Sequence, residues 1–432
     1  MFCSSQFYRF MCEMEVYMKK NFWTGMIIGL CSAIILFLVG GSVWSFALSK
    51  AEGSGKTTVN NTSGNKSTEK KEIPYDKIVS KLTYLQKLVG DYYLRDVNDV
   101  SFEDGIYKGF IASLQDPYSV YYTKDEYKSL MESSSGVYCG IGATVSQDAK
   151  TGVITIVKPF STGPAYKVGI LPGDHLYKVN DDAVTGMDLS QVVSKMKGEP
   201  GSKVKISVVR AGKTEPIQYT ITRQNIEIPT IEYKMLDNKI GYISIAEFDE
   251  VTVNQFIAAV DQLEKDGMKG LVVDVRNNPG GLLNSVVKIL DRLLPPELLV
   301  YTEDKAGERE DKKAIDNKKI TVPMAVLING QSASASEIFA GALQDYKTAT
   351  LVGTTSFGKG IVQQVIPLSD GTAVKLTIEK YFTPNGRNIH GTGIKPDIEV
   401  KLNEDVQKTA VIPFDKDNQL QEAIKNVQQQ IK

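Results

Sequence analysis

A serine, a lysine and a glutamine in the C-terminal half of the chain have types and spacing that could perform chemistry. Ser334 lies in the segment NGQSASASEIFAGALQDY, and Lys359 and Gln363 lie in the segment GTTSFGKGIVQQ. A serine hydroxyl becomes a nucleophile when a neighbouring base removes its proton, and a neutral lysine amine is one such base. These residues therefore indicate acyl-transfer chemistry, provided that the fold brings them together.

The lysine segment has a second interpretation, because GTTSFGK fits the pattern G-x-x-x-x-G-K of a phosphate-binding loop. Such a loop needs Ser or Thr after the lysine to hold magnesium, and a helix start to bind phosphate. Here Gly360 follows the lysine, and the next residues, IVQQVIPL, have the composition of a strand. The sequence therefore argues against a nucleotide site, and we expect no cofactor.

A strand at this place would put Lys359 and Gln363 on the same face, because side chains alternate along a strand. The glutamine amide oxygen could then accept a hydrogen from the lysine amine and orient it. A surface lysine is the plain alternative. A lysine base must be neutral, whereas its reference pKa is about 10.4 and burial lowers it by up to roughly 3–5 units. We therefore expect an enclosed Lys359 with no carboxylate beside it, and TTSFGKGIVQQ contains no acid.

The serine lies where an apolar strand, VPMAVLIN, runs through small residues into a helix. Two interpretations stay open for it. Ser334 and Glu337 have the spacing of a capping box, in which the serine begins the helix. Alternatively, a serine held at a helix start is a nucleophile whose neighbouring amides stabilise an oxyanion. The amides of Ala335 and of Gly280, in the segment DVRNNPGG, would then form the oxyanion hole, although an ordinary loop also explains that segment.

Other chemistries have little support in the composition. Of the two histidines, His390 is the one in the C-terminal half, and it lies in a glycine-rich loop. There is no H-E-x-x-H pattern and no cysteine pair, so we expect no metal site. Cys139, the one cysteine after the N-terminal region, is expected to be a small buried hydrophobe. Lys and Arg number 50 against 51 Asp and Glu, so no net charge favours nucleic acid.

Residues 22–48 form an apolar run without charged side chains. As a helix the run would be about 40 Å long, against about 30 Å for the hydrocarbon core of a bilayer. Lys19 and Lys20 precede it, so the positive-inside rule predicts that residues 1–21 are cytoplasmic and that the rest is outside the cell membrane. A single-pass anchor is the favoured interpretation. A signal peptide cleaved after small residues such as Ala47 and Ser49 is the alternative.

The rest of the chain divides into five segments by composition. Residues 49–73 are a polar, flexible linker, and residues 74–133 are a helical region with an apolar stripe. Residues 134–225 read as a compact β-rich module with glycine-rich turns. In residues 226–402 strands and helices alternate, which predicts an α/β fold. Residues 403–432 form a helical extension with Leu420, Ile424, Val427 and Ile431 on one face.

Taken together, these patterns resemble the C-terminal processing (tail-specific) peptidases. The segments SASASE, FGKG and the glutamine four residues after the lysine match the family's catalytic signature, and RNNPGG and DPYSVY also match. The resemblance implies a crotonase-like α/β protease core with an inserted PDZ domain, in which Ser334 is the nucleophile, Lys359 the general base and Gln363 its positioning residue. The amides of Cys139, Gly140 and Ile141 would bind the terminal carboxylate of a substrate.

The sequence therefore predicts a membrane-anchored, ATP-independent serine endopeptidase. Its expected partners are proteins or peptides with apolar C-termini, and the resemblance also implies a homodimer joined through terminal helices. The rival hypothesis is a catalytically inactive scaffold that binds tails through its PDZ domain. The complete match at Ser334, Lys359 and Gln363 argues against that rival.

Overall fold

The computed structural model describes residues 73–98, 100–316, 319–407 and 412–431, which fall into two compact units, Met1–Asp96 and Val97–Lys432. In the first unit, one helix is described, α2 (Tyr75–Tyr92), and none of its residues is buried. No helix in the described part of the chain is both long and apolar enough to span a bilayer. The predicted anchor at 22–48 lies outside the described residues, as does nearly all of the predicted linker.

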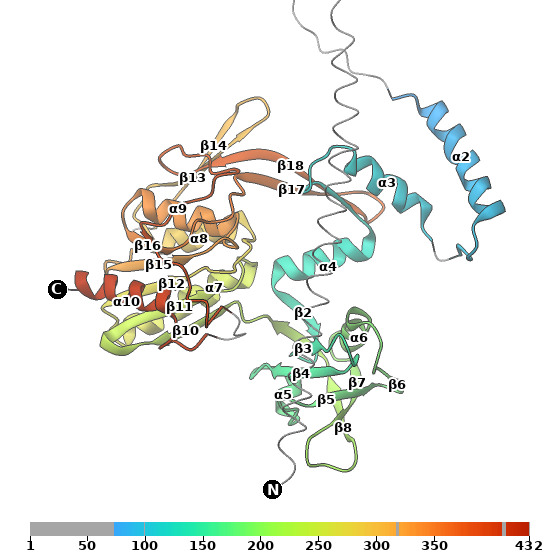
Figure 1. Ribbon diagram of the computed structural model, residues 1–432, viewed down its shortest axis with the longest axis horizontal. Coiled ribbons are helices and arrows are strands. Elements are labelled where there is room, and N and C mark those ends of the chain that lie inside the picture. The colour runs from blue at the N-terminus through green and yellow to red at the C-terminus, as the bar shows by residue number, and fades with distance from the viewer. Residues whose placement is uncertain (1–72, 99, 317–318, 408–411, 432) are drawn as a thin grey trace, which may run out of the picture. The chain divides into compact units, whose positions relative to one another are not determined.

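The second unit is built around a six-stranded sheet (Figure 1). Its strands run parallel except for the first, which pairs antiparallel with its neighbour. The order across the sheet is β10 (Ile231–Met235), β11 (Ile240–Ile245), β12 (Gly270–Asp274), β15 (Met324–Ile328), β16 (Ala349–Gly353) and β19 (Ile398–Glu399).

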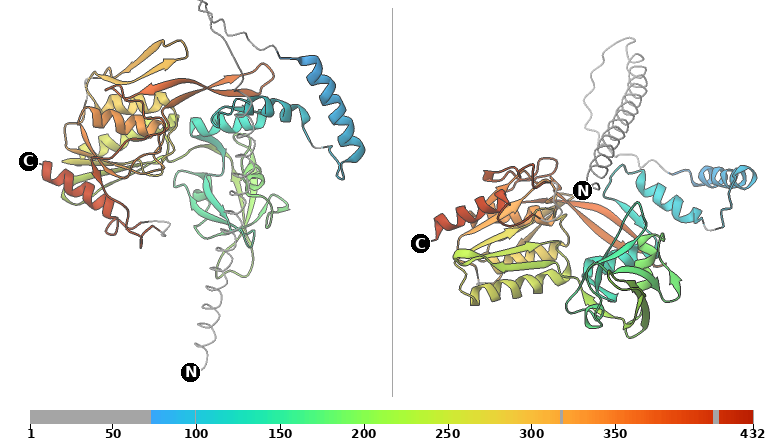
Figure 2. Two further views of the ribbon diagram at one scale, coloured as in Figure 1. Left: turned by 45° about the horizontal axis from the view of Figure 1, so that its top comes forward. Right: turned by 60° about the horizontal axis from the view of Figure 1, so that its bottom comes forward.

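Helices cover both faces of this sheet, as the right-hand view of Figure 2 shows for α7 and α10. Successive side chains of a strand point to opposite faces of the sheet, and in the central strands both sets are apolar and are covered by helices. Val273 and Val326 pack with α7 (Glu250–Lys265), α8 (Leu283–Leu293) and α9 (Ala335–Asp345), whereas Val272 and Ala325 pack with α10 (Asn418–Gln430). Strands buried on both faces lack polar alternation, which is why GLVV and VPMAVLI are continuous apolar runs. The predicted α/β core is confirmed.

A second, antiparallel sheet carries the segment after the lysine. It contains β1 (Val120–Tyr122), β18 (Ala373–Phe382), β13 (Leu298–Asp304) and β14 (Arg309–Lys313), and β17 (Ile361–Pro367) pairs with the other side of the long strand β18. The residues after Lys359 are therefore a strand, as predicted. A phosphate loop would need a helix at this position.

Residues 134–225 hold a separate apolar core, as predicted for a compact β-rich module. The strands are β3 (Ala143–Gln147), β4 (Ile154–Pro159), β5 (His175–Val179), β6 (Asp182–Ala183), β7 (Lys203–Val209) and β8 (Ile217–Thr222), with helices α5 (Pro164–Lys167) and α6 (Leu189–Met196). Strands β7 and β8 form a hairpin across the Ala211-Gly212 turn, and Asp188 caps α6. A two-stranded sheet of β2 (Val137–Gly140) and β9 (Gln224–Glu227) joins the module to the rest of the unit.

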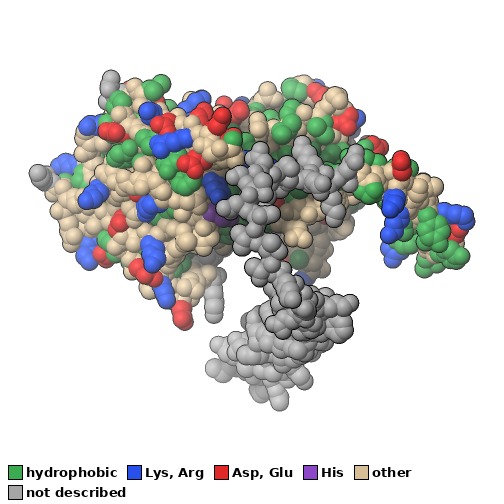
Figure 3. Space-filling view, turned by 90° about the horizontal axis from the view of Figure 1, so that it is seen from above, with side chains coloured by type: hydrophobic (Ala, Val, Ile, Leu, Met, Phe, Trp, Pro, Cys, Tyr) green, Lys and Arg blue, Asp and Glu red, His purple; other side chains and the backbone are tan. Residues whose placement is uncertain are grey.

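The remaining described elements are α3 (Phe102–Ala112), α4 (Lys124–Ser135) and the short helix η1 (Asp237–Lys239). No residue of α3 is buried, and its apolar side chains include the exposed Phe110. On the face seen in Figure 3, basic and acidic side chains are interspersed and no large area of one sign stands out. This mixture agrees with the near-zero net charge of the chain.

Candidate active site

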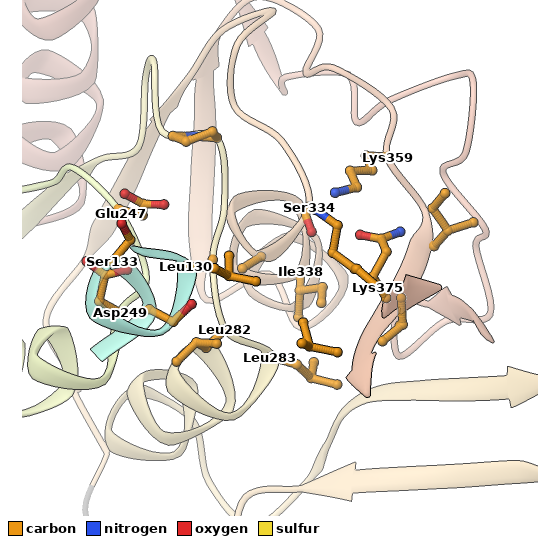
Figure 4. Close-up of a pocket in the computed structure, with 18 of the residues that line it drawn as sticks. Leu130, Ser133, Glu247, Asp249, Leu282, Leu283, Ser334, Ile338, Lys359 and Lys375 are labelled. Carbon is orange, nitrogen blue, oxygen red and sulfur yellow. The ribbon is translucent and has the colours of Figure 1, made fainter. Parts of the chain in front are cut away.

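A cavity of about 350 Å³ in the second unit brings Ser334, Lys359 and Gln363 together (Figure 4). Ser334 comes from the start of α9, Lys359 from the loop between β16 and β17, and Gln363 from β17 itself. The amine of Lys359 points toward Ser334 in Figure 4. The other lining residues come from α4, from the segment after β11, from the start of α8 and the loop before it, from α9, and from β17 and β18.

Ser334 has an unusual backbone conformation, with φ 53° and ψ −114°. Such a conformation costs a non-glycine residue about 1–3 kcal/mol and persists only where the surroundings hold it. Hydrogen bonds to its N–H and its carbonyl hold it here. The Ser334 N–H donates to Oε2 of Glu337 at 2.9 Å. The Ser334 carbonyl accepts from the Tyr381 hydroxyl at 3.1 Å and from the N–H groups of Glu337 and Ile338. Ser334 thus begins the helix, as the capping interpretation predicts, and also lines the cavity, as a nucleophile must.

Lys359 is half-buried, and its amine lies 4.8 Å from the centroid of the Tyr118 ring. Burial lowers the pKa of Lys359 below its usual value, and the nearby charge of Lys375 lowers it further. The carboxylates of Asp116 and Glu337 act in the opposite direction. Distant segments of the chain therefore bring acids into the electrostatic surroundings of Lys359 that the local sequence lacks.

Gln363 lines the same cavity as Lys359, but not for the reason that strand alternation suggested. Strand β17 begins at Ile361, after Lys359, and its pairing with β18 shifts register between Val362 and Gln363. A simple two-residue period therefore does not connect the two side chains. The amide nitrogen of Gln363 lies 3.5 Å from Oγ1 of Thr377, a long hydrogen bond.

The two predicted oxyanion donors lie side by side. Gly280 packs against the serine segment, since a Cβ placed on it would be 3.0 Å from the backbone nitrogen of Ala335. The Ala335 N–H is the first of α9 and therefore has no partner within the helix. The Gly280 N–H, in contrast, donates to Oδ1 of Asn278 at 2.8 Å. In this structure the second predicted donor is thus engaged by a neighbouring side chain.

The loop that contains Gly280 is anchored at its start by Arg276. This guanidinium is bonded to Asp274 at the end of β12 and to Asp417, with Nη2 to Oδ2 distances of 2.6 and 2.7 Å. It also donates to Oε1 of Gln419 at 2.9 Å. The side chains of Arg276, Asp274 and Asp417 are each at most 11% exposed, so this is a buried ionic network between the loop and the C-terminal segment.

The cavity also contains two acidic residues that sequence patterns did not indicate. Glu247 and Asp249 flank Phe248, and Figure 4 shows them on the side of the cavity away from Lys359 and Lys375. Burial raises the pKa of Asp249 to about 7, and the charge of Glu247 adds to the effect.

His390, which was not predicted to act, and the three residues predicted to bind a carboxylate do not line this cavity. His390 is exposed, and its Nδ1 is 3.4 Å from the backbone nitrogen of Gly360. Of the predicted carboxylate-binding residues, Cys139 and Gly140 belong to β2, where they pair with Asn225 and Gln224. Ile141 follows the strand and is buried. Cys139 is a free thiol of intermediate exposure and not a fully buried one, and burial raises its pKa.

Three family models match the chain. Peptidase family S41 matches residues 239–400, the PDZ domain matches residues 138–221, and the N-terminal domain of the activating protease CtpB matches residues 37–126. The second of these ranges lies within the β-rich module, and the first contains every strand of the six-stranded sheet except β10.

Curated relatives are similar over most of their length. The carboxy-terminal processing protease CtpA of Bacillus subtilis is 39% identical over 354 residues, which are 82% of this chain and 74% of the relative. CtpB of the same organism is 38% identical over 76% of this chain and 68% of its own length. Among solved structures, the photosystem II D1 C-terminal processing protease is 29% identical, with a TM-score of 0.44 over 76% of this chain and 89% of that one.

Proposed function

Because this chain belongs to peptidase family S41 and is a C-terminal processing serine protease with a PDZ domain, we propose that Ser334 is its nucleophile and Lys359 its general base. The observation that carries the proposal is the shared cavity, in which the lysine amine points toward a serine held in a strained conformation. No His competes for the role of base, since His390 is not among the residues that line this cavity.

The proposed reaction begins with neutral Lys359, which takes the proton of the Ser334 hydroxyl as the oxygen attacks the carbonyl carbon of a substrate peptide bond. The resulting oxyanion faces the N–H of Ala335 at the positive end of α9. When the intermediate collapses, the Lys359 ammonium returns the proton to the departing amine, leaving an acyl ester on Ser334. Lys359 then activates a water molecule, which releases the acid and restores the serine.

Two residues assist in this proposal. Gln363 positions the amine of Lys359, for which its place in the same cavity is the support. Gly280 donates the second hydrogen bond to the oxyanion, and for this its N–H must leave Asn278. Substrate binding would supply the new acceptor, since an anionic oxygen accepts a stronger hydrogen bond than a neutral amide oxygen.

We further propose that the PDZ domain recognises apolar C-terminal tails, with the amides of Cys139, Gly140 and Ile141 binding the terminal carboxylate. A cavity of about 240 Å³ in this domain supports the idea. Ile141 lines it together with other apolar side chains, among them Val145, Phe160, Val193 and Met196. Such a lining suits an apolar last residue.

The location proposed for the enzyme is the cell membrane, with residues 22–48 as a single-pass anchor and the protease domain outside. The support is the uncharged apolar run and the lysines before it. We also propose a homodimer joined through terminal helices. For this, the support is that α2 and α3 bury none of their residues and expose apolar side chains such as Leu85 and Phe110.

Cleavage by the full-length chain tests the catalytic assignment. An unfolded protein with a free apolar C-terminus is supplied without ATP. Ser334→Ala and Lys359→Ala are expected to abolish cleavage, whereas His390→Ala retains it. Unchanged cleavage by Lys359→Ala would reject the dyad.

The tail proposal needs a separate measurement, because binding and cleavage can fail independently. The full-length Ser334→Ala chain is titrated with a peptide that has an apolar C-terminus, and with the same peptide amidated. The free carboxylate is expected to bind more tightly. Equal affinity would remove the role assigned to Cys139, Gly140 and Ile141.

A further inference from the structure

Glu337 is a fully buried carboxylate next to the proposed dyad. It lies in the first turn of α9 and has no measurable exposure. Among the described residues, no ion pair joins its carboxylate to the side-chain nitrogen of a Lys or Arg within 4 Å. A buried charge without a counter-ion is stable only when hydrogen bonds satisfy it.

Four hydrogen bonds satisfy this carboxylate, and they come from two separate segments. Oε1 accepts from the Ser356 hydroxyl at 2.6 Å and from the Gly358 N–H at 2.7 Å. Oε2 accepts from the Ser334 N–H at 2.9 Å and from the Lys359 N–H at 2.8 Å. Because every partner is a donor, the side chain acts as the ionised form, which accepts at both oxygens.

One oxygen atom therefore connects the backbones of the proposed nucleophile and the proposed base. The nitrogens of Ser334 and Lys359 can be separated by no more than the sum of their two distances to Oε2. The Ser356 hydroxyl, in turn, accepts the N–H of Ile394 at 2.7 Å, so its own proton is directed to Glu337. The carboxylate is thus held in one orientation.

We propose that Glu337 is a positioning residue that sets the separation of Ser334 and Lys359, beyond its role in capping the helix. This inference rests on the proposed function of the dyad. A capping residue needs only the bond to the Ser334 N–H. The three bonds to residues 356–359 have no part in capping, and they place the lysine loop against the start of α9. The strained conformation of Ser334 needs such support.

Glu337→Gln tests this role with almost no change in shape. The glutamine amide has a single acceptor oxygen. Its nitrogen would take the place of the other carboxylate oxygen and, as a donor, could not accept the two hydrogen bonds made there. Misplacing reacting groups by about 1 Å lowers rates by about 100-fold. We therefore expect kcat of the full-length chain to fall by about 100-fold, while KM stays within about twofold because substrate contacts remain.

The pH profile separates positioning from general stability. The negative charge of Glu337 raises the pKa of Lys359, so its removal is expected to move the acid limb of kcat/KM to lower pH. A matched control is Asp345→Asn in the same helix, because Asp345 is also a buried carboxylate but binds Arg387 and the Asn385 N–H. This variant is expected to lose thermal stability and to keep the kcat and pH profile of the folded enzyme.

A Glu337→Gln enzyme that melts earlier but keeps the wild-type kcat and pH profile would overturn the proposal. If Glu337→Gln does not fold, Ser356→Ala tests the positioning role instead, because it removes one of the two donors to Oε1 of Glu337. A smaller fall in kcat at constant KM supports the role, and an unchanged kcat overturns it. Retained cleavage by Ser334→Ala would instead reject the nucleophile assignment, a result that the Glu337 variants do not produce.

Discussion

Gly280 packs directly against Ser334, so that a Cβ on Gly280 would lie 2.8 Å from the Cβ of Ser334 and 2.7 Å from the carbonyl oxygen of Ala333. Its φ of +111° also disfavours any other residue. We predict that Gly280→Ala pushes the serine segment away from the loop and lowers kcat by about 100-fold or more. Steady-state kinetics on protein shown to be folded by circular dichroism measures the effect.

Gly330→Ala is the matched control for this substitution. A Cβ at Gly330 would meet no atom closer than 3.9 Å, and its φ is not in the left-handed region. This variant is expected to keep wild-type kcat. Equal losses in the two variants would mean that the contact between Gly280 and Ser334 is not the cause.

The second prediction concerns the charge of Lys375. Lys359 is proposed to act in its neutral form, so kcat/KM rises as pH passes upward through the pKa of Lys359. The charge of Lys375 lowers that pKa. Lys375→Met is therefore expected to raise it and to move the acid limb of the profile to higher pH.

A pH series of kcat/KM with Lys375→Met and Lys380→Met checks this effect. Lys380 lies on the same strand but is exposed and does not line the cavity. Its removal should leave the limb in place. A limb that stays fixed in the Lys375 variant would show that this charge does not tune the base.

The third prediction follows from Asp249, whose pKa is raised from 3.8 to about 7, first by burial and then by the charge of Glu247. A raised pKa in a folded acid means that ionisation costs stability. The contribution of Asp249 to stability is therefore greatest below its unfolded pKa, and it is lost as pH rises toward 7. Asp249→Asn removes this cost, so its Tm should exceed the wild-type value by roughly 2–4 °C at pH 8 and match it at pH 4.

Thermal melts at the two pH values measure the difference. Glu250→Gln is the control, since Glu250 is exposed in the first turn of the same helix. It should give no gain at either pH. A gain for Asp249→Asn that is equal at pH 4 and pH 8 would contradict the link to ionisation.

The structure agrees with the predictions that rest on a pattern within one short segment of the sequence. The apolar runs predicted the buried parallel strands, and the S-x-x-E spacing predicted the bond from Glu337 to the Ser334 N–H. The same spacing gave no indication of the bonds from Glu337 to residues 356–359, because these depend on how the lysine loop packs on α9.

The site residues that the sequence patterns did not indicate are brought there by contacts between distant segments. Tyr118, Lys375 and Tyr381 reach the site because β1 and β17 both pair with β18. The matching segment DPYSVY marked the neighbourhood of Tyr118 without giving its role. No local pattern in β18 distinguishes Lys375 from Lys380, the other lysine of that strand. The register shift between Val362 and Gln363 likewise has no glycine or proline at those positions to indicate it.

The fourth prediction concerns the ionic network at the start of the glycine loop. Asp417→Asn leaves the buried Arg276 with one carboxylate, Asp274. Breaking a buried pair by removing one partner costs about 3–5 kcal/mol. We expect a lower Tm, and also a lower kcat because Arg276 leads directly into the loop that ends at Gly280.

Melting and kinetic measurements on Asp417→Asn and Asp415→Asn test this expectation. Asp415 is exposed and lies in the same segment, so its neutralisation should change neither quantity. A wild-type kcat in folded Asp417→Asn would separate the network from catalysis and leave it a role in stability alone.

Arg276 and Asp417 are 141 positions apart in the chain, and this separation has a consequence for the order of synthesis. A ribosome makes Arg276 long before it makes the carboxylate that completes the network around it. While the chain is still being extended, the loop beside Ser334 lacks this anchor. The loop beside Ser334 therefore gains its second carboxylate anchor only after Asp417 has been made.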